Sequence, residues 1–337
     1  MADKAEIDFT HHTSAHCESG TTSNLLLHYG ISASEALVFG MGSGLFFGYF
    51  PFIKLNGLPL ITFRSLPRKI IRNVTKRLGI KVEITTFKDT EKSMEALDSV
   101  LRKGVPVGLQ TSVYWLPYFP PPMREHFNSH FIVAYRINGS SYHISDPIFD
   151  KPVTCPREDL IRARFSKGTF APNGRMFHFT SVPEQVDLAS AVVKGIKETC
   201  FFMLKVPIPI MGVRGVRFFA KNLKNWPEKH GDRKTHLFLG NAVRLQEEVG
   251  TGGGGFRFMY AAFLQEAAAI LNDNRLLDLS NRMTAIGDRW RDFAVSCARI
   301  YKNRASEKDS FILLSEILLD CADREDRLFR DLSEIVR

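Results

Sequence analysis

The first part of the chain, up to about residue 180, alternates short apolar runs with turn-forming residues. This pattern is typical of β-strands bounded by glycine, proline or asparagine. Residues 64–79 and 90–104, which lie between the apolar runs, predict short helices that each end at a glycine. The expected strands are residues 59–63, 80–87, 105–113, 130–137 and 141–146.

After residues 180–185 the apolar residues recur at spacings of three and four, which is the period of an amphipathic helix. One stripe consists of Met283, Ile286, Trp290, Phe293, Cys297 and Ile300; another consists of Leu314, Leu318, Cys321, Leu328, Leu332 and Ile335, and Glu325 interrupts it. Cys297 and Cys321 are therefore predicted to be core residues. We expect an α+β domain over residues 1–183 and an all-α domain over residues 184–337.

The composition fits this two-domain picture. With 337 residues, 44% of them hydrophobic, the chain is long enough for two domains with cores of their own. Five cysteines without close pairing are typical of a reducing compartment. The start of the chain lacks the basic and apolar regions of a signal peptide, and glycines and a proline interrupt the apolar residues 36–53. We therefore expect a soluble, cytoplasmic protein without a membrane span, in which residues 36–53 form a buried, turn-rich segment.

Positive charge is concentrated in one stretch of the chain. The formal net charge is +9, and residues 194–234 hold ten Lys and Arg against three acidic residues. Such a stretch favours an acidic partner, which can be a phosphate, a nucleic acid or an acidic protein. A solvated surface without a partner is the alternative interpretation.

Cys17 is the candidate nucleophile, because it falls at the predicted start of a helix. Ser14 is the expected N-cap and Gly30 the expected C-cap. The free N–H groups and the dipole of a helix N-terminus favour a thiolate there.

A histidine and a carboxylate can complete this site. Residues 130–146 predict a β-hairpin that turns near residues 138–141, so His130 and Asp146 should be cross-strand neighbours with Cβ atoms roughly 5 Å apart. An early cysteine at a helix start, followed far downstream by a histidine with its carboxylate, is the pattern of a cysteine nucleophile with its base and orienting group.

Other chemistries compete with this interpretation. His11, His12, His16 and Cys17 are close enough in sequence to hold zinc, but no second Cys or His cluster completes such a site. Cys155 and Cys200 lack a matching histidine and carboxylate. Residues 247–271 contain a glycine run that opens a helix with Arg257 in its first turn, which can bind a phosphate or can be a tight turn.

Several motifs together resemble the butirosin biosynthesis protein H family. They are HCESGTTSNLLLHYG (16–30), SEALVFGMGSGLFFGY (34–49), VYWLPY (113–118), HFIVAYRI (130–137) with the later Asp-Pro, and GTGGGGFRFMYAAFLQEAA (250–268). They cover most of the chain in the family's order. The resemblance implies a papain-like N-terminal domain related to bacteriocin-processing cysteine peptidases, followed by a helical C-terminal domain.

The resemblance also implies acyl transfer rather than proteolysis. The namesake of that family moves an aminoacyl group from an acyl carrier protein thioester to an amine of an aminoglycoside. By motif position Cys17 is the nucleophile, His130 the base and acid, and Asp146 the orienting group. Papain-like peptidases carry an oxyanion-binding glutamine six residues before the cysteine; here this position is His11, whose ring N–H can donate instead.

We therefore expect a cysteine-dependent acyltransferase of natural-product biosynthesis, with no metal and no cofactor besides the phosphopantetheine on its donor. The expected partners are an acidic acyl carrier protein and a small-molecule amine, not a nucleic acid. The candidate contacts to the carrier and its phosphate are Arg214, Arg217, Lys221 and Arg257.

The alternatives are a thioesterase or leader peptidase that uses the same triad, a non-catalytic binding module, and an enzyme that cyclises its acyl chain. The helical domain can bind the carrier, the acceptor or a second copy of the chain, and the sequence does not choose among them.

Overall fold

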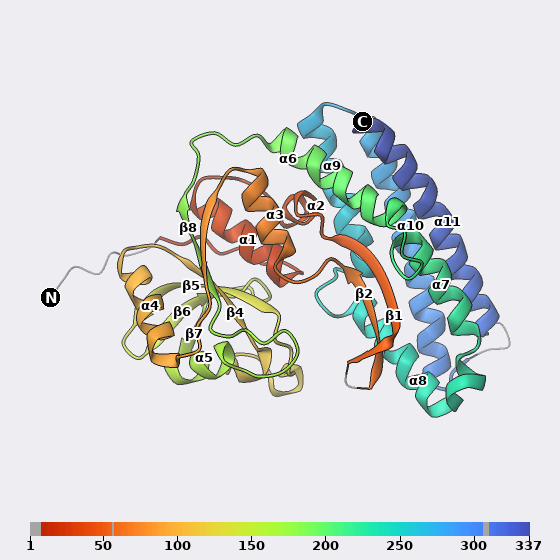
Figure 1. Cartoon of the computed structure of the whole chain (residues 1–337), viewed down its shortest axis with the longest axis horizontal. Helices are drawn as coiled ribbons and strands as arrows, with labels where there is room; N and C mark the ends of the chain where they lie inside the picture. The colour runs from red at the N-terminus through yellow and green to blue at the C-terminus, as the bar shows by residue number, and fades with distance from the viewer. Residues whose placement is uncertain (1–7, 56, 306–309) are drawn as a thin grey trace. The chain divides into compact units, whose positions relative to one another are not determined.

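The computed structural model describes residues 8–55, 57–305 and 310–337. The chain divides into two compact units, residues 1–38 with 74–186 and residues 39–73 with 187–337 (Figure 1). The sequence division at residue 183 assigned residues 39–73 to the first domain, whereas the structure includes them in the second unit. The start of the chain, on which the signal-peptide expectation rests, includes residues 1–7, which lie outside the described residues.

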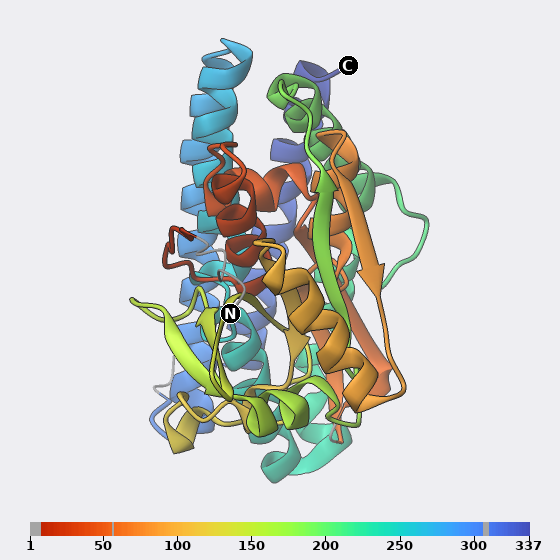
Figure 2. The same ribbon diagram turned by 90° about the vertical axis from the view of Figure 1, so that its left-hand side faces the viewer.

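The first unit is built on a six-stranded antiparallel sheet with the strand order β3-β8-β4-β5-β6-β7. β3 and β8 lie side by side at one end of this sheet (Figure 2). The strands are β3 (Lys81–Thr85), β4 (Val107–Thr111), β5 (His130–Asn138), β6 (Ser141–Ser145), β7 (Val153–Pro156) and β8 (Met176–Ser181).

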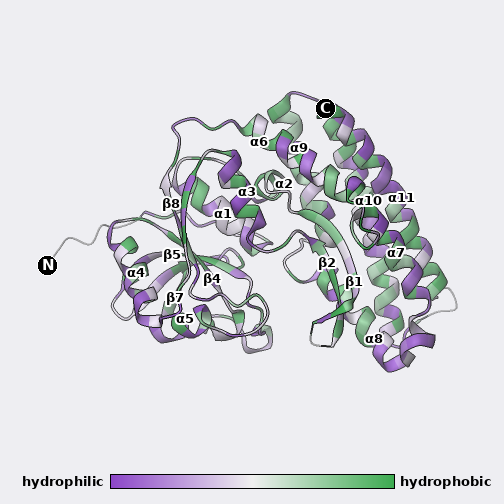
Figure 3. Cartoon of the chain, viewed as in Figure 1, coloured by the Kyte–Doolittle hydropathy of each residue, from purple (hydrophilic) through white to green (hydrophobic). Residues whose placement is uncertain are grey.

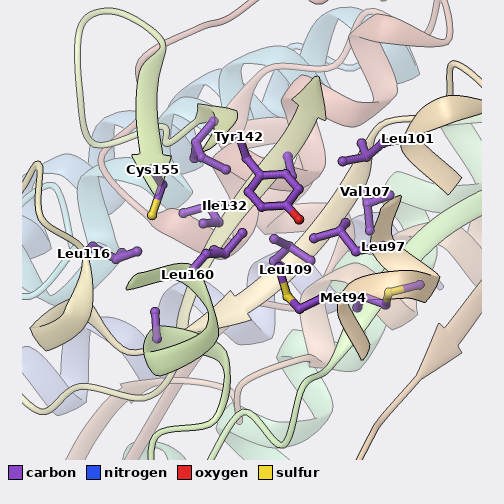
Figure 4. Packing of buried hydrophobic residues seen from close by; sticks show 14 of the residues in the cluster. Met94, Leu97, Leu101, Val107, Leu109, Leu116, Ile132, Tyr142, Cys155 and Leu160 are labelled. Atoms are coloured by element: carbon purple, nitrogen blue, oxygen red, sulfur yellow. The ribbon is translucent and has the colours of Figure 1, made fainter. Parts of the chain in front are cut away.

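Helices and one main hydrophobic cluster complete the first unit. Leu97 and Met94 of α4, Leu160 of α5, and Leu109 and Ile132 of the central strands are buried together (Figure 4). α1 packs beside β5. The helices are α1 (Cys17–His28), α4 (Thr90–Arg102) and α5 (Arg157–Arg164), with short 3₁₀ turns η1 (Val113–Trp115) and η2 (Pro121–Met123). α2 (Glu35–Met41) and α3 (Lys69–Arg77) run across the boundaries of the two units.

The second unit combines a hairpin with a group of helices. The hairpin pairs β1 (Leu45–Leu55) with β2 (Leu58–Arg64). Phe47 and Tyr49 of β1 pack against Trp290, Phe219 and Trp226 of the helices. These aromatic contacts explain why residues 39–73 belong to this unit. The helices are α6 (Leu188–Cys200), η3 (Phe201–Lys205), α7 (Gly212–Lys224), α8 (Trp226–Glu247), η4 (Gly254–Phe256), α9 (Arg257–Leu271), α10 (Arg275–Tyr301) and α11 (Phe311–Ile335).

The predicted fold class is confirmed: a sheet-containing N-terminal part precedes a mostly helical C-terminal part. Hydrophobic and hydrophilic residues alternate along α10 and α11 (Figure 3), and Cys297 and Cys321 are fully buried, as the stripes predict. Residues 36–53 were expected to be rich in turns, but half of them lie in the long strand β1 and a third lie in the helix α2. Among the described residues, no helix is both long enough and apolar enough to cross a membrane.

Candidate active site

Cys17 is the first residue of α1, in the first unit, and only 7% of its surface is exposed. His16 is the N-cap, and its side chain accepts a hydrogen bond from the N–H of Ser19. The predicted N-cap, Ser14, instead donates its backbone N–H to the carbonyl of Pro147. Gly30 follows the helix with φ +79°, which favours glycine and ends the helix as expected. The thiol therefore lies at a helix N-terminus, although a different residue caps it.

Glu35, which was not among the predicted site residues, holds the segment before the nucleophile. Its carboxylate accepts hydrogen bonds from the backbone N–H groups of Ala15 and His16. Burial raises the pKa of Glu35, and these hydrogen bonds partly offset that effect. Glu35 thus fixes the chain that leads into Cys17.

His130 begins β5 and lies in direct reach of both other members of the predicted triad. Its Nε2 is 2.7 Å from Oδ2 of Asp146, and its ring is almost fully buried. Cys17 also lies close enough to the imidazole to raise its pKa, and the Cys17 Sγ lies 3.6 Å from the carbonyl oxygen of Ser129. Because Nε2 faces Asp146, Nδ1 is the nitrogen left to exchange a proton with the thiol.

The charges around His130 favour its protonated form. Burial alone lowers the pKa of the imidazole, but Asp146 and Cys17 raise it by more, to about 10. The imidazolium is therefore the resting form at neutral pH, and it lies between two groups that can carry negative charge.

The register of the hairpin differs from the simplest expectation. Val133 pairs with Ser145, and an irregularity between Ala134 and Arg136 shifts the strands. Asp146 therefore lies beyond the last paired residue, and its side chain reaches diagonally back to His130. The predicted contact is present, although the two residues are not directly opposite each other.

Asp146 is fully buried and accepts three hydrogen bonds. Besides His130, the Tyr118 hydroxyl donates to Oδ2 at 3.0 Å, and the Ile148 backbone N–H donates to Oδ1 at 3.1 Å. Phe119 contacts the His130 ring edge to face, with 5.4 Å between the ring centres. Tyr118 was not predicted to have this role, although it is the last residue of the VYWLPY motif.

The oxyanion role expected for His11 is not supported by its geometry. Its Nδ1 lies 2.7 Å from the Ser145 hydroxyl, and its Nε2 lies 2.8 Å from the carbonyl oxygen of Phe149. Both ring nitrogens are thus engaged, and the side chain instead ties the N-terminal segment to the end of β6. The backbone N–H of Cys17 has no acceptor among the described residues.

The remaining candidates for metal binding and thiol chemistry do not gather at a second site. Within residues 8–55, 57–305 and 310–337, no group of three or more His, Cys, Asp or Glu is placed to hold a metal ion. Burial raises the pKa of the Cys155 and Cys200 thiols to about 12 and that of Cys297 and Cys321 well above its ordinary value. These four thiols are therefore protonated at neutral pH.

The four basic candidates lie in the second unit and differ in their surroundings. Arg214 and Lys221 are exposed on α7 and form no ion pair with any described residue. Arg217, on the same helix, pairs with Asp323 at 2.8 Å. Arg257 is fully buried and pairs with Glu325, which also accepts a hydrogen bond from the Trp290 ring N–H. This environment does not support the phosphate-binding role expected for Arg257, because its charge is already paired inside the core.

The glycine run before Arg257 forms a tight turn. Gly253, Gly254 and Gly255 have φ values of +87°, +56° and +56°, and a Cβ on Gly255 would lie 2.5 Å from the Phe63 ring. The turn brings the Gly255 carbonyl to 2.7 Å from Nη1 of Arg257. The glycine run therefore forms a tight turn. Its Gly255 carbonyl accepts a hydrogen bond from the arginine of the buried ion pair.

The arrangement of Cys17, His130 and Asp146 is that of papain-like cysteine enzymes. It consists of a cysteine at a helix start, a histidine at the start of a strand, and a carboxylate that contacts the imidazole nitrogen facing away from the thiol. Residues 16–147 match the family model of butirosin biosynthesis protein H, N-terminal. Residues 158–332 match the family described as a domain of unknown function, DUF4872.

A crystal structure described as a candidate C39-like peptidase from Bacillus anthracis is similar to 54% of this chain and 96% of that chain, with 16% sequence identity and a TM-score of 0.36. No curated protein matches the chain. The DUF4872 match spans more than half of the 337 residues. The chain therefore belongs to the DUF4872 family, and its residues 16–147 form a domain like the N-terminal domain of butirosin biosynthesis protein H, as the sequence motifs predicted.

Proposed function

We propose that the protein is a cysteine-dependent acyltransferase, which moves an acyl or aminoacyl group from a phosphopantetheine thioester to an amine. The observation that carries this proposal is the buried imidazole of His130, which contacts Asp146 at 2.7 Å and lies close enough to Cys17 for the thiol to raise its pKa. The match to the butirosin biosynthesis family supports a role in natural-product biosynthesis.

The reaction has two steps. The Cys17 thiolate attacks the thioester carbonyl, and the donor thiol leaves with the proton of the His130 imidazolium. Neutral His130 then removes a proton from the incoming amine, which attacks the acyl-Cys17 and restores the thiolate. Asp146 accepts a hydrogen bond from Nε2–H of His130. Nδ1 is therefore the nitrogen that gives up the proton in the first step and takes one in the second. The backbone N–H of Cys17 is the proposed donor to the oxyanion.

The same triad also suits water as the acceptor, which would make the protein a thioesterase or leader peptidase. Product analysis separates these readings. With an acyl-pantetheine thioester and an excess of a simple amine, the transferase releases amide in excess of free acid, and the Cys17→Ala variant releases neither above background. Free acid as the main product at saturating amine would favour the hydrolase.

Two further hypotheses, a binding module and a cyclising enzyme, predict different experimental results. A binding module has a Cys17 no more reactive toward alkylating reagents than a model thiol. A cyclising enzyme releases a ring from an acyl chain that carries its own amine.

The proposed donor protein is an acidic acyl carrier protein, which would dock on the exposed cations of α7. Arg214 and Lys221 support this assignment because no described carboxylate neutralises them, whereas Arg217 is paired with Asp323. The variant Arg214→Glu with Lys221→Glu should slow transfer from a carrier-bound donor and leave a free pantetheine donor unaffected. Lys88→Glu with Lys151→Glu, two exposed lysines of the first unit, is the matched control. Unchanged carrier-dependent rates would refute this docking site.

A further inference from the structure

A pocket of about 420 Å³ lies in the first unit, beside the loop that leads into His130. Its apolar wall consists of Trp115, Ile161 and Phe165, and His126 lies at its side. The pocket also contains two cations, Arg162 and Lys167, and no carboxylate belongs to its lining. This lining suits an anionic group carried on an aliphatic chain.

The two cations are available to a ligand to different degrees. Lys167 is exposed and forms no ion pair within the part of the chain that the structure describes. The Arg162 guanidinium lies 5.7 Å from the centre of the Trp115 ring, and its only described acidic neighbour is Asp159 at 3.6 Å, one turn away on the exposed side of α5. An exposed pair of this kind is weak, so the Arg162 charge remains largely available.

The pocket is attached to the strand that carries the catalytic histidine. The Asn128 side chain donates hydrogen bonds to the carbonyls of Lys167 and Thr169, at 3.0 and 3.1 Å. The next residue, Ser129, has its carbonyl 3.6 Å from the Cys17 Sγ. Because three residues of chain span at most about 11 Å, His126 lies within that distance of Ser129. The His126 side of the pocket therefore lies near the residue whose carbonyl oxygen contacts the Cys17 Sγ.

We infer that this pocket is the subsite for the phosphate end of the acyl donor's pantetheine arm. This inference rests on the function proposed above. Lys167 and Arg162 would bind the phosphate, and Trp115 with Ile161 would contact the branched aliphatic part that follows it. The phosphate remains unchanged in the reaction, so the subsite positions the donor and takes no part in bond making.

The test compares two donors with the same acyl group, one on 4′-phosphopantetheine and one on pantetheine without phosphate. The measurement is the second-order rate of Cys17 acylation, followed by intact mass. The inference predicts that the phosphorylated donor acylates the wild type at least about tenfold faster, the effect of one charge-assisted hydrogen bond. The variant Arg162→Gln with Lys167→Gln should lose this preference and keep its rate with the unphosphorylated donor.

Both substituted side chains are exposed, so the variant should fold normally, and circular dichroism checks this point. Lys88→Gln with Lys151→Gln removes the same charge from the same unit outside the pocket and should retain the preference. Equal rates with both donors on the wild type, or a preference that survives in the pocket variant, would overturn the subsite and leave the acyltransferase proposal intact. Failure of both donors to acylate Cys17 would overturn the acyltransferase proposal itself.

Discussion

The Tyr118 hydroxyl donates a hydrogen bond to Oδ2 of Asp146, the same carboxylate oxygen that faces Nε2 of His130. Tyr118 therefore withdraws negative charge from the oxygen that holds the imidazolium. Replacing Tyr118 by Phe should slow Cys17 acylation about tenfold, because a hydrogen bond to a charged group is worth about 1.5 kcal/mol or more. The same change should raise the pKa of His130 further, since the carboxylate charge is then shared with one donor fewer.

Both effects can be measured on one protein sample. Acylation rates give the loss of activity, and NMR titration of the His130 ring gives the direction of the pKa change. Tyr135→Phe is a suitable control, because no described residue hydrogen-bonds with the Tyr135 hydroxyl. A rate loss in Tyr118→Phe without any change in the His130 titration would mean that Tyr118 supports the fold and not the triad.

Substitutions of Asp146 should separate orientation from charge. Asp146→Asn keeps an oxygen that can accept from His130 Nε2, as the asparagine of papain-like peptidases does. Its amide nitrogen, however, cannot accept the hydrogen bond that the Ile148 backbone N–H donates to Oδ1 of Asp146. We expect Asp146→Asn to retain part of the acylation rate and Asp146→Ala to lose at least about a hundredfold, measured by single-turnover acylation. Equal activity of Asp146→Ala and wild type would remove Asp146 from the mechanism.

The stability of the first unit should fall with rising pH. The pKa of His130 is about 10 in the folded chain, against about 6.5 for an unfolded histidine. Between these values the folded chain binds the extra proton, so its stabilisation is complete below pH 6.5 and is lost as pH rises toward 10. The slope is at most about 1.4 kcal/mol per pH unit.

Hydrogen exchange of peptides from β5 and β6 measures the local stabilisation that protonated His130 provides. The difference in opening free energy between wild type and His130→Gln should shrink as pH rises from 6.5 to 10. A difference that stays constant over this range would show that His130 is not protonated in the folded chain at neutral pH.

The buried pair of Arg257 and Glu325 should matter far more for stability than the exposed pair of Arg217 and Asp323. Replacing Arg257 by Met leaves an unpaired buried carboxylate and should cost about 3–5 kcal/mol in the free energy of unfolding. Adding Glu325→Gln removes that charge while keeping an acceptor for Trp290, and should recover much of the loss. Replacing Arg217 by Ala should cost less than about 1 kcal/mol, because both partners are partly exposed.

Urea denaturation of the wild type and of these three variants measures the differences in the free energy of unfolding. If Arg257→Met and Arg217→Ala have equal effects, the description of Arg257 as a neutralised core residue is wrong. A strong loss of activity with the carrier protein in Arg257→Met at full stability would instead restore the original phosphate-binding hypothesis.

The sequence predicts the triad because each member has a local signal. Cys17 precedes a helix-forming stretch, and His130 and Asp146 flank a turn in which Asn138 and Gly139 are easily recognised. The irregularity between Ala134 and Arg136 has no such signal, so the register was predicted only approximately. Glu35 and Tyr118 were missed because their partners lie in other elements, and no periodicity links them to the site.

Arg257 is a residue that the sequence marks as unusual without revealing its partner. The glycine run and the interruption of an apolar stripe at Glu325 were both visible in the sequence as isolated irregularities. Their common cause is an ion pair between residues 68 positions apart, and only the packing of α9 against its neighbours brings these residues together. Local patterns indicate that such residues are unusual, whereas the tertiary structure identifies their partners.

Intact-mass spectrometry of the protein after incubation with short acyl-pantetheine thioesters tests the central claim most directly. The proposed mechanism predicts a mass increase of one acyl group on the wild type, none on Cys17→Ala, and discharge of the adduct by added amines. A folded wild type that gains no acyl group from any thioester, or that gains it equally in Cys17→Ala, would contradict the claim.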